Sequence, residues 1–234
     1  MPPLIEIIPG LHQLPRLLSG SPFFVEHDGQ VALIDGGIRG SHPSVLGALA
    51  ALGKSPAVID QLIATHTHLD HVGGFARLRR LSSARVAVHE AEARFMDGST
   101  PYQNPFSHPL VAWLAAPFLV PITAPPVPVD RILKDGDRFD LLGGTEVVHT
   151  PGHTAGSISL YLPAHGVLIV GDAMEARCGR LSGPMGIFTA DMAQAHASIK
   201  RISSLDVETL CFSHFPPMRG GVRQALRRLA NSFD

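Results

Sequence analysis

Four side chains that can bind a metal ion lie within six residues of this sequence, in the segment His66-Thr67-His68-Leu69-Asp70-His71. The segment 61–64 before it predicts a strand, and the chain after it predicts a helix over about 74–81. Alternate side chains of an extended chain point to the same side, so His66 and His68 face one space, and Asp70 and His71 turn toward it as the helix begins. The fold must therefore deliver a strand into a helix at one edge of a sheet, with a metal site at that edge.

Three later polar residues also follow predicted strands. His153 lies on the Gly/Pro loop 150–154 directly after a strand, where the backbone can approach closely. Asp172 ends the apolar strand 167–170, which is an unfavourable place for an unpaired carboxylate and a good one for a metal ligand. His214 follows the strand 209–212 in the same way. Together these segments supply seven candidate metal ligands: His66, His68, Asp70, His71, His153, Asp172 and His214.

Strand and helix patterns alternate along both halves of the chain. Strands are predicted at 23–25, 31–34, 61–64, 85–88, 147–148, 157–161, 167–170 and 209–212, and helices at 41–52, 74–81, 90–95, 190–202 and 222–229. The sequence has no short repeat and no low-complexity segment. The layout favours two sheets between helices, within a single domain over residues 1–234.

Residues 96–130 interrupt this pattern with eight prolines, which exclude a long helix or a central strand. We predict an insertion with one or two short helices. Its apolar stretch 110–119 carries the only tryptophan, and apolar side chains of this kind need a surface to cover. The insertion is therefore either a lid, with Phe106, Trp113 and Phe118 lining a substrate pocket, or a contact between two copies in a homodimer.

Charge and composition limit the partners and the compartment. The formal net charge is −1, and the 19 Lys and Arg residues form no dense block, so nothing indicates nucleic acid or an anionic membrane as a partner. Neither a signal peptide nor an apolar run of about 20 residues is present in the sequence. Cys178 and Cys211 lack CxxC spacing, and we interpret them as buried apolar residues in a reducing compartment. We expect a cytoplasmic protein with a small-molecule substrate.

The order of these residues resembles the metallo-β-lactamase superfamily, whose pattern of HxHxDH, His, Asp and His is matched between Asp35 and His214. The segments Asp35-Gly36-Gly37 and Thr150-Pro151-Gly152-His153-Thr154 are also typical of it. The resemblance implies an α/β fold, a four-layer αβ/βα sandwich with its site at one edge of the two sheets. It further implies that His66, His68 and His153 bind one metal ion, that Asp70, His71 and His214 bind a second, that Asp172 bridges them, and that Asp35 orients the site.

The chemistry of the ligands agrees with that division. Seven ligands exceed what one tetrahedral ion accepts, so two ions that share one carboxylate are the economical assignment. Zinc suits imidazole and carboxylate ligands best, and iron, manganese or cobalt fit the same set. A hydroxide bridging the ions would be the nucleophile, and Asp70 could accept its proton. His149, four residues before His153, either supports the site from outside or makes only local hydrogen bonds.

Comparison with the branches of the superfamily narrows the expected reaction. True β-lactamases usually have Cys or Ser where this chain has Asp172, which disfavours antibiotic hydrolysis, and the short segment after His214 disfavours the helical domain that holds glutathione in classical glyoxalase II enzymes. We therefore expect a glyoxalase II-like or lactonase-like hydrolase of an ester, lactone or thioester bond. The alternatives are a mononuclear iron oxygenase of the persulfide dioxygenase kind and a metal-binding module without turnover.

Overall fold

The computed structural model describes residues 4–15, 20–119, 123–177 and 179–233 of the chain. The chain divides into two compact units: the first comprises Met1–Gln103 and Ala115–Leu133, and the second comprises Asn104–Leu114 and Lys134–Asp234. The single domain predicted from the sequence stays a prediction. Cys178 and positions 120–122 of the predicted insertion lie outside the described residues.

The first unit contains a seven-stranded sheet whose strands follow the order of the sequence. Its strands are β1 (Ile5–Ile8), β2 (Leu11–Gln13), β3 (Phe23–His27), β4 (Gln30–Ile34), β5 (Ile59–Ile63), β6 (Arg85–His89) and β7 (Arg131–Leu133). Neighbours from β1 to β4 pair antiparallel, and neighbours from β4 to β7 pair parallel. The carboxyl ends of β4, β5 and β6 therefore meet at one edge of this sheet.

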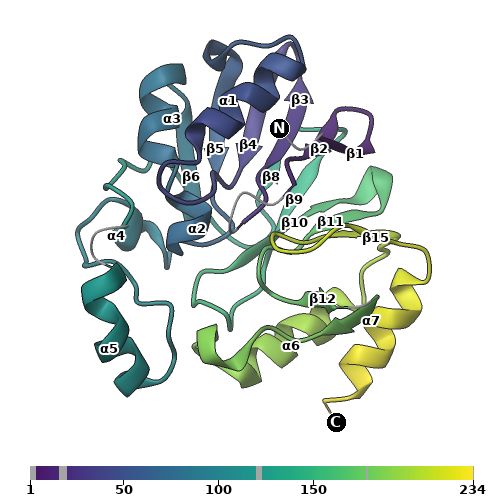
Figure 1. Cartoon of the computed structure of the whole chain (residues 1–234). Coiled ribbons are helices and arrows are strands. Elements are labelled where there is room, and N and C mark those ends of the chain that lie inside the picture. The colour runs from purple at the N-terminus through teal and green to yellow at the C-terminus, as the bar shows by residue number, and fades with distance from the viewer. Residues whose placement is uncertain (1–3, 16–19, 120–122, 178, 234) are drawn as a thin grey trace. The chain divides into compact units, whose positions relative to one another are not determined.

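Helices cover the parallel part of this sheet. The crossover from β4 to β5 contains α1 (His42–Ala51) and the short 3₁₀ helix η1 (Pro56–Val58), and the crossover from β5 to β6 contains α2 (Leu69–Val72) and α3 (Phe75–Ser82) (Figure 1). Val45 and Leu49 of α1 and Phe75 of α3 are fully buried in one apolar cluster with β4, β5 and β6. Burial of this apolar face stabilises the edge on which the HxHxDH segment lies.

The second unit contains a six-stranded sheet in the order β15-β14-β11-β10-β9-β8 and a separate β12-β13 hairpin. Their bounds are β8 (Arg138–Phe139), β9 (Thr145–His149), β10 (Ile158–Leu162), β11 (Val167–Ile169), β12 (Glu175–Arg177), β13 (Arg180–Ser182), β14 (Thr209–Cys211) and β15 (Met218–Arg219). β11 and β14 are parallel neighbours, and the other pairs are antiparallel. This parallel pair carries two of the predicted metal ligands to the same edge.

Two helices pack on the core of the second unit, α6 (Met192–Ile202) and α7 (Val222–Asn231), which lie side by side in Figure 1. Ile199 and Leu226 are fully buried in a cluster with Leu210 and Phe212. The Asp191 side chain caps α6 by accepting a hydrogen bond from the backbone N–H of Gln194 at 3.0 Å. The short 3₁₀ helices η3 (Pro163–His165) and η4 (Gly186–Phe188) lie in loops of this unit.

The predicted elements are present with small shifts at their ends. The helix predicted at 90–95 is the single turn α4 (Ala93–Met96), because residues 90–92 form a turn after β6. Within its described residues, the insertion contains the helix α5 (Pro109–Leu119), which accommodates Pro117 in its last turn. Strands β1, β2, β7, β8, β12, β13 and β15 were not predicted; each has four residues or fewer.

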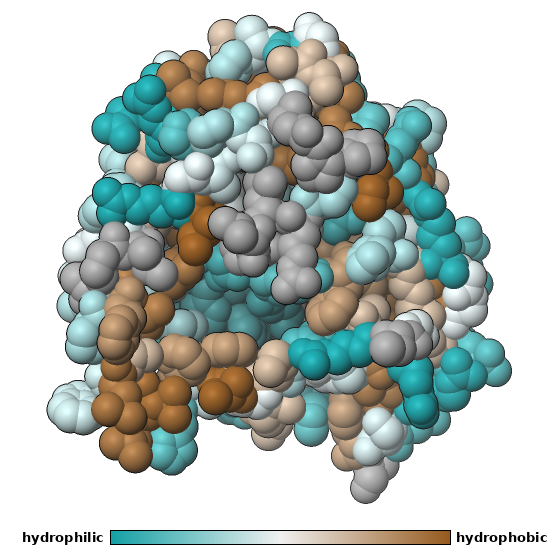
Figure 2. All heavy atoms as spheres, in the orientation of Figure 1, coloured by the Kyte–Doolittle hydropathy of each residue, from teal (hydrophilic) through white to brown (hydrophobic). Residues whose placement is uncertain are grey.

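The surface of α5 is apolar. Leu110, Trp113, Leu114 and Phe118 are between 56% and 77% exposed. Figure 2 shows the hydrophobic side chains gathered over this helix, at the lower left of the view. In the part of the chain that the structure describes, no helix has the length and apolar character needed to cross a membrane.

Candidate metal centre

The predicted ligands of the HxHxDH segment lie together in the first unit, between the end of β5 and the turn of α2. The ring centroids of His66 and His68 are 4.7 Å apart, and those of His66 and His71 are 4.0 Å apart. Asp70 Oδ2 lies 3.9 Å from Nε2 of His71. The three histidines are buried and Asp70 is half-buried, so this half of the predicted ligand set is assembled within one unit.

The backbone of this segment is held at every second residue by a different side chain. The N–H of Thr65 donates to Asp35 Oδ1 at 2.8 Å, the N–H of Thr67 to Glu92 Oε2 at 3.0 Å, and the N–H of Leu69 to the Tyr102 hydroxyl at 2.6 Å. The predicted ligands His66 and His68 alternate with these three, and Asp70 lies in the first turn of α2. Since neighbouring residues of an extended chain face opposite sides, the contacts at Thr65 and Thr67 favour one direction for the side chains of His66 and His68.

Asp35 contacts His71 as well as the backbone. It follows β4 at φ 58°, a left-handed conformation that aspartate tolerates better than most residues. Its carboxyl group also accepts from Oγ1 of Thr65 at 2.9 Å and lies 2.8 Å from Nδ1 of His71. Because a carboxylate can only accept, Nδ1 of His71 carries the proton in this contact, and Nε2 has the lone pair that a metal ion requires. The predicted orienting role of Asp35 stays a prediction with this geometry in its support.

The sequence analysis missed Glu92 and Tyr102. Glu92 is fully buried, but it lies three residues beyond the end of β6 and inside the helix predicted over 90–95, so no pattern in the sequence marked it. Tyr102 lies in the Pro-rich segment, and no pattern there indicates its contact with α2. Burial raises the pKa of the Tyr102 hydroxyl far above its usual value, so this group is neutral at physiological pH.

In the second unit, strand register brings Asp172 and His214 together. The parallel pairing of β11 with β14 aligns Ile169 with Cys211, and each ligand lies three residues beyond its strand partner. Nε2 of His214 is 3.1 Å from Oδ2 of Asp172. Both side chains are half-buried, and the contact follows directly from the matched lengths of the two strand ends.

His153 completes the set in this unit, with Nε2 at 3.6 Å from the same Asp172 oxygen. Its loop is close to α6: Gly152 has φ 135°, and a Cβ there would lie 2.3 Å from the backbone nitrogen of Ala195. Only glycine fits this conformation and this approach. The N–H of Thr154 donates to Ser157 Oγ at 3.0 Å, which fixes the loop on the side toward β10.

His149 lies at the end of β9 among other polar groups. Its N–H donates to Asp135 Oδ1 at 2.8 Å, its ring Nε2 lies 3.0 Å from the Ala155 carbonyl, and Arg201 donates to its carbonyl at 3.2 Å. Burial by itself raises the pKa of Asp135. The hydrogen bonds from Arg201 and His149 lower this pKa by more than burial raises it, so the pKa lies below its usual value. His149 thus makes local hydrogen bonds, which is one of the two roles predicted for it. The other role, support of the metal site from outside, stays a prediction.

The three predicted pocket residues differ in exposure. Phe106 is half-buried, and its ring lies 5.2 Å from that of Phe188. Trp113 and Phe118 are 72% and 77% exposed. The segment around Phe106 is tied down by Ser107, whose hydroxyl donates to the carbonyl of Gly186 at 2.8 Å. A role for these side chains in binding substrate stays a prediction.

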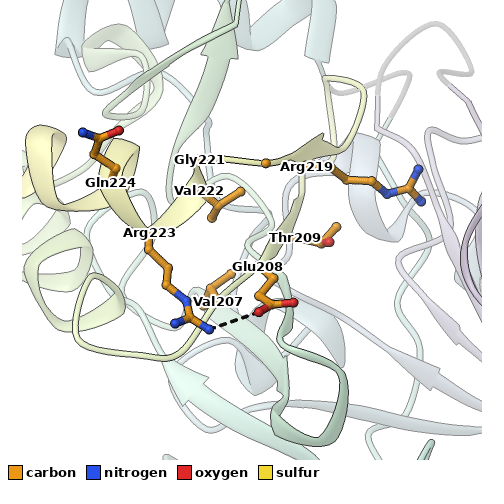
Figure 3. A pocket seen from close by; sticks show the side chains of 9 residues that line it. Val207, Glu208, Thr209, Arg219, Gly221, Val222, Arg223 and Gln224 are labelled. Atoms are coloured by element: carbon orange, nitrogen blue, oxygen red, sulfur yellow. Dashed lines mark hydrogen bonds and ion pairs between the residues drawn. The ribbon is translucent and has the colours of Figure 1, made fainter.

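A surface hollow of about 550 Å³ lies at the start of α7 in the second unit (Figure 3). It is lined by residues 207–209 and 219–224, which are not among the predicted ligands. Arg223 points toward Glu208 at 3.2 Å and also pairs with Asp206. Two of its charged side chains, Arg223 and Glu208, thus pair with each other.

Each ligand set suits a divalent transition metal. The first unit offers three imidazoles and one carboxylate, and the second offers two imidazoles and one carboxylate. Nitrogen and oxygen donors of this kind are those that zinc and other first-row metals bind. The residues present therefore fit the divalent metal ions predicted from the sequence.

Comparisons with known proteins relate most of the chain to one family. The family model described as the metallo-beta-lactamase superfamily matches residues 15–214. A hydroxyacylglutathione hydrolase of Aeromonas hydrophila is 33% identical over 192 residues, which are 81% of this chain and 58% of that protein. A second one, of Cereibacter sphaeroides, is 29% identical over 205 residues, 84% of this chain and 63% of that protein. The chain thus spans about three fifths of the length of these curated relatives.

Solved structures show the fold. A metallo-beta-lactamase family protein of Thermus thermophilus superposes with a TM-score of 0.73 at 25% identity, covering 97% of this chain and 80% of that one. A subclass B3 metallo-beta-lactamase of Bradyrhizobium japonicum has a TM-score of 0.69 at 19% identity, covering 99% and 92%. The α/β fold class predicted from the sequence is confirmed.

Proposed function

Because this chain belongs to the metallo-β-lactamase superfamily, we propose that it is a metal-dependent hydrolase whose two ligand sets act together on two divalent ions. His66, His68 and His153 hold the first ion, Asp70, His71 and His214 hold the second, and Asp172 bridges them. The family model spans all seven residues. Zinc is the first metal to test, with iron, manganese and cobalt as alternatives.

The position of Asp172 carries this proposal. Its Oδ2 atom lies 3.6 Å from Nε2 of His153 and 3.1 Å from Nε2 of His214. These histidines are assigned to different ions, so one carboxylate oxygen lies beside a ligand of each. A half-buried carboxylate between two imidazoles is the arrangement that a bridging ligand needs.

The residues then have distinct chemical tasks. When bound, the two ions supply Lewis acidity and lower the pKa of a bound water toward neutrality. The Asp70 carboxylate, 24% exposed, accepts the proton of the attacking water and passes it toward the leaving group. Asp35 holds His71 in the tautomer that presents Nε2, which keeps the second ligand group in place during turnover.

The substrate class is an ester, lactone or thioester of a small molecule. The curated relatives named hydroxyacylglutathione hydrolase support a thioester, so an acyl-glutathione thioester is the first substrate to test. We assign the apolar part of the substrate to Phe106, Trp113 and Phe118, whose side chains are more apolar than a solvated loop requires.

The experiment begins with metal analysis of the purified chain, followed by assays against an acyl-glutathione thioester, an aryl ester, a γ-lactone and a phosphodiester. We expect two ions per chain, hydrolysis of at least one carbonyl substrate, loss of activity with a chelator, and recovery with zinc. Asp140→Ala, at an exposed aspartate of the second unit, is the control for Asp172→Ala. A single iron ion with oxygen consumption on a persulfide would instead establish the oxygenase alternative and overturn the proposal.

A further inference from the structure

The two threonines of the segment Thr65-His66-Thr67-His68 are held by carboxyl groups from opposite sides. Asp35, after β4, accepts from both the N–H and the Oγ1 of Thr65. Glu92, after β6, accepts from both the N–H and the Oγ1 of Thr67. The strands that supply them are the two parallel neighbours of β5, which delivers the segment. The threonines thus alternate with the histidine ligands, and each is anchored through two groups.

Glu92 is placed for this contact by its own backbone. Its N–H donates to the His89 carbonyl at 2.9 Å, and its carbonyl accepts from the N–H groups of Phe95 and Met96 at 3.0 and 3.1 Å. These bonds belong to the turn between β6 and α4 and do not involve the carboxyl group. The side chain is fully buried, and its Oε2 atom reaches Thr67, 25 residues earlier in the chain. Replacing the side chain therefore leaves the turn itself intact.

The contact constrains the residue that joins two histidine ligands. The bond at the Thr67 N–H orients the peptide between residues 66 and 67, and the bond at Oγ1 fixes the Thr67 side chain. A buried carboxyl group with two donors is strongly favoured, and losing it leaves both donors without their acceptor. Without Glu92, the segment would have several conformations available in place of one, and the histidines would be ordered only when an ion binds.

We propose that Glu92 is a positioning residue, which holds His66 and His68 in their ligand geometry before any metal ion is present. This inference rests on the proposed function, which assigns both histidines to the first ion. It predicts a selective effect, because Glu92 anchors ligands of the first ion while Asp35 anchors His71 of the second. If Glu92 merely stabilised the core, its removal would lower the stability of the protein and leave the ratio of the two metal affinities unchanged.

The test compares four variants of the full chain: Glu92→Ala, Glu92→Gln, Thr67→Val and the control Glu90→Gln. Glu90 is exposed and lies two residues away in the same turn. Amide hydrogen exchange of Thr67 is measured in the metal-free proteins, and the affinities for Zn²⁺ and Co²⁺ are measured by competition with a chromophoric chelator. The visible spectrum of the Co²⁺ protein reports the geometry of each site.

We expect the Thr67 amide of Glu92→Ala to exchange about tenfold faster or more, and its first ion to bind about 10- to 100-fold more weakly, with the second ion changed far less. Glu92→Gln keeps one acceptor oxygen and should recover most of this loss. Thr67→Val keeps the backbone bond and should show an intermediate effect. Glu90→Gln should match the wild type in every measurement.

Wild-type exchange and affinity in Glu92→Ala would overturn the inference while leaving the proposed function standing. If Glu92→Ala does not fold, Glu92→Gln and Thr67→Val decide, and an unchanged Co²⁺ spectrum and affinity in both would overturn the inference. If the wild-type chain binds no metal, the proposed function fails, and exchange of the Thr67 amide still decides whether Glu92 orders the segment.

Discussion

Replacing Asp35 tests how the histidine site is built, because this residue combines buried hydrogen bonds with an unfavourable backbone conformation. Asp35→Ala removes the acceptor for Thr65 N–H, Thr65 Oγ1 and His71 Nδ1, all of them buried. Each buried donor that loses its acceptor costs about 1–3 kcal/mol. Alanine at φ 58° adds about 1–2 kcal/mol. Together these terms give about 4–11 kcal/mol. Because the three donors share one carboxyl group, their costs are not additive, and we expect a loss near the lower end, about 4–5 kcal/mol, comparable to breaking a buried ion pair.

Asp35→Asn separates metal binding from stability. Asparagine tolerates the left-handed conformation and retains one oxygen for Thr65, so we expect a loss of only about 1–2 kcal/mol. Its amide N–H₂ group would face Nδ1 of His71 and favour the tautomer with the proton on Nε2. The second ion should then bind about 10- to 100-fold more weakly, although the protein folds.

The assays are urea unfolding of the metal-free variants and zinc competition with a chelator. Asp28 is the matched control, because it is exposed, lies in the β3–β4 turn and has φ 43°. Asp28→Ala should show the backbone cost alone, about 1–2 kcal/mol. Equal losses in Asp28→Ala and Asp35→Ala would refute the argument, since the buried hydrogen bonds would then contribute nothing.

Three further predictions concern the bridging ligand, the exposed helix and a surface ion pair. Asp172→Ala should lower the bound metal, measured by emission spectrometry, to one ion or fewer per chain, because both proposed ions lose an anionic ligand. Trp113→Ala should keep its metal content and change the ratio of kcat/KM between short and long acyl substrates, and a bound product should shift the Trp113 emission of the wild type. Burial by itself raises the pKa of Glu26, but its contacts with Lys54 and His12 lower this pKa by more than burial raises it, so the pKa lies below its usual value of 4.5. Glu26→Gln should therefore cost about 0.5 kcal/mol in urea unfolding at neutral pH, and this difference should disappear as the pH falls below 4.5, through the lowered pKa of the folded protein.

Each of these predictions has an outcome that contradicts it. Two ions held by Asp172→Ala at wild-type affinity would exclude the bridging role. A Trp113 signal that depends on protein concentration and ignores every ligand would assign α5 to a contact between copies of the chain. If Glu26→Gln still lowers the free energy of unfolding in acid, the ion pair with Lys54 is not the source of the stability that this variant loses.

The sequence alone predicted the long strands and the residues at their ends. β11 is an apolar run that a polar group follows, β5 ends in the apolar residues Leu62 and Ile63, and the HxHxDH spacing after β5 has few uses other than metal binding. The contact between Asp172 and His214 depends on the register of β11 with β14. Both residues were nevertheless picked out, because each follows its own apolar strand and the pattern is local.

Only the tertiary structure showed that Glu92 and Tyr102 contact the site and that short strands lie at the margins of the sheets. Glu92 and Tyr102 contact the segment from 25 and 33 residues away, and their own neighbours in the sequence carry no trace of the contact. Strands such as β8, with two residues, are stabilised by hydrogen bonds to a partner strand rather than by a pattern of their own. Local periodicity reports which face of an element is buried, whereas the partner of a buried polar group is determined by how distant segments pack.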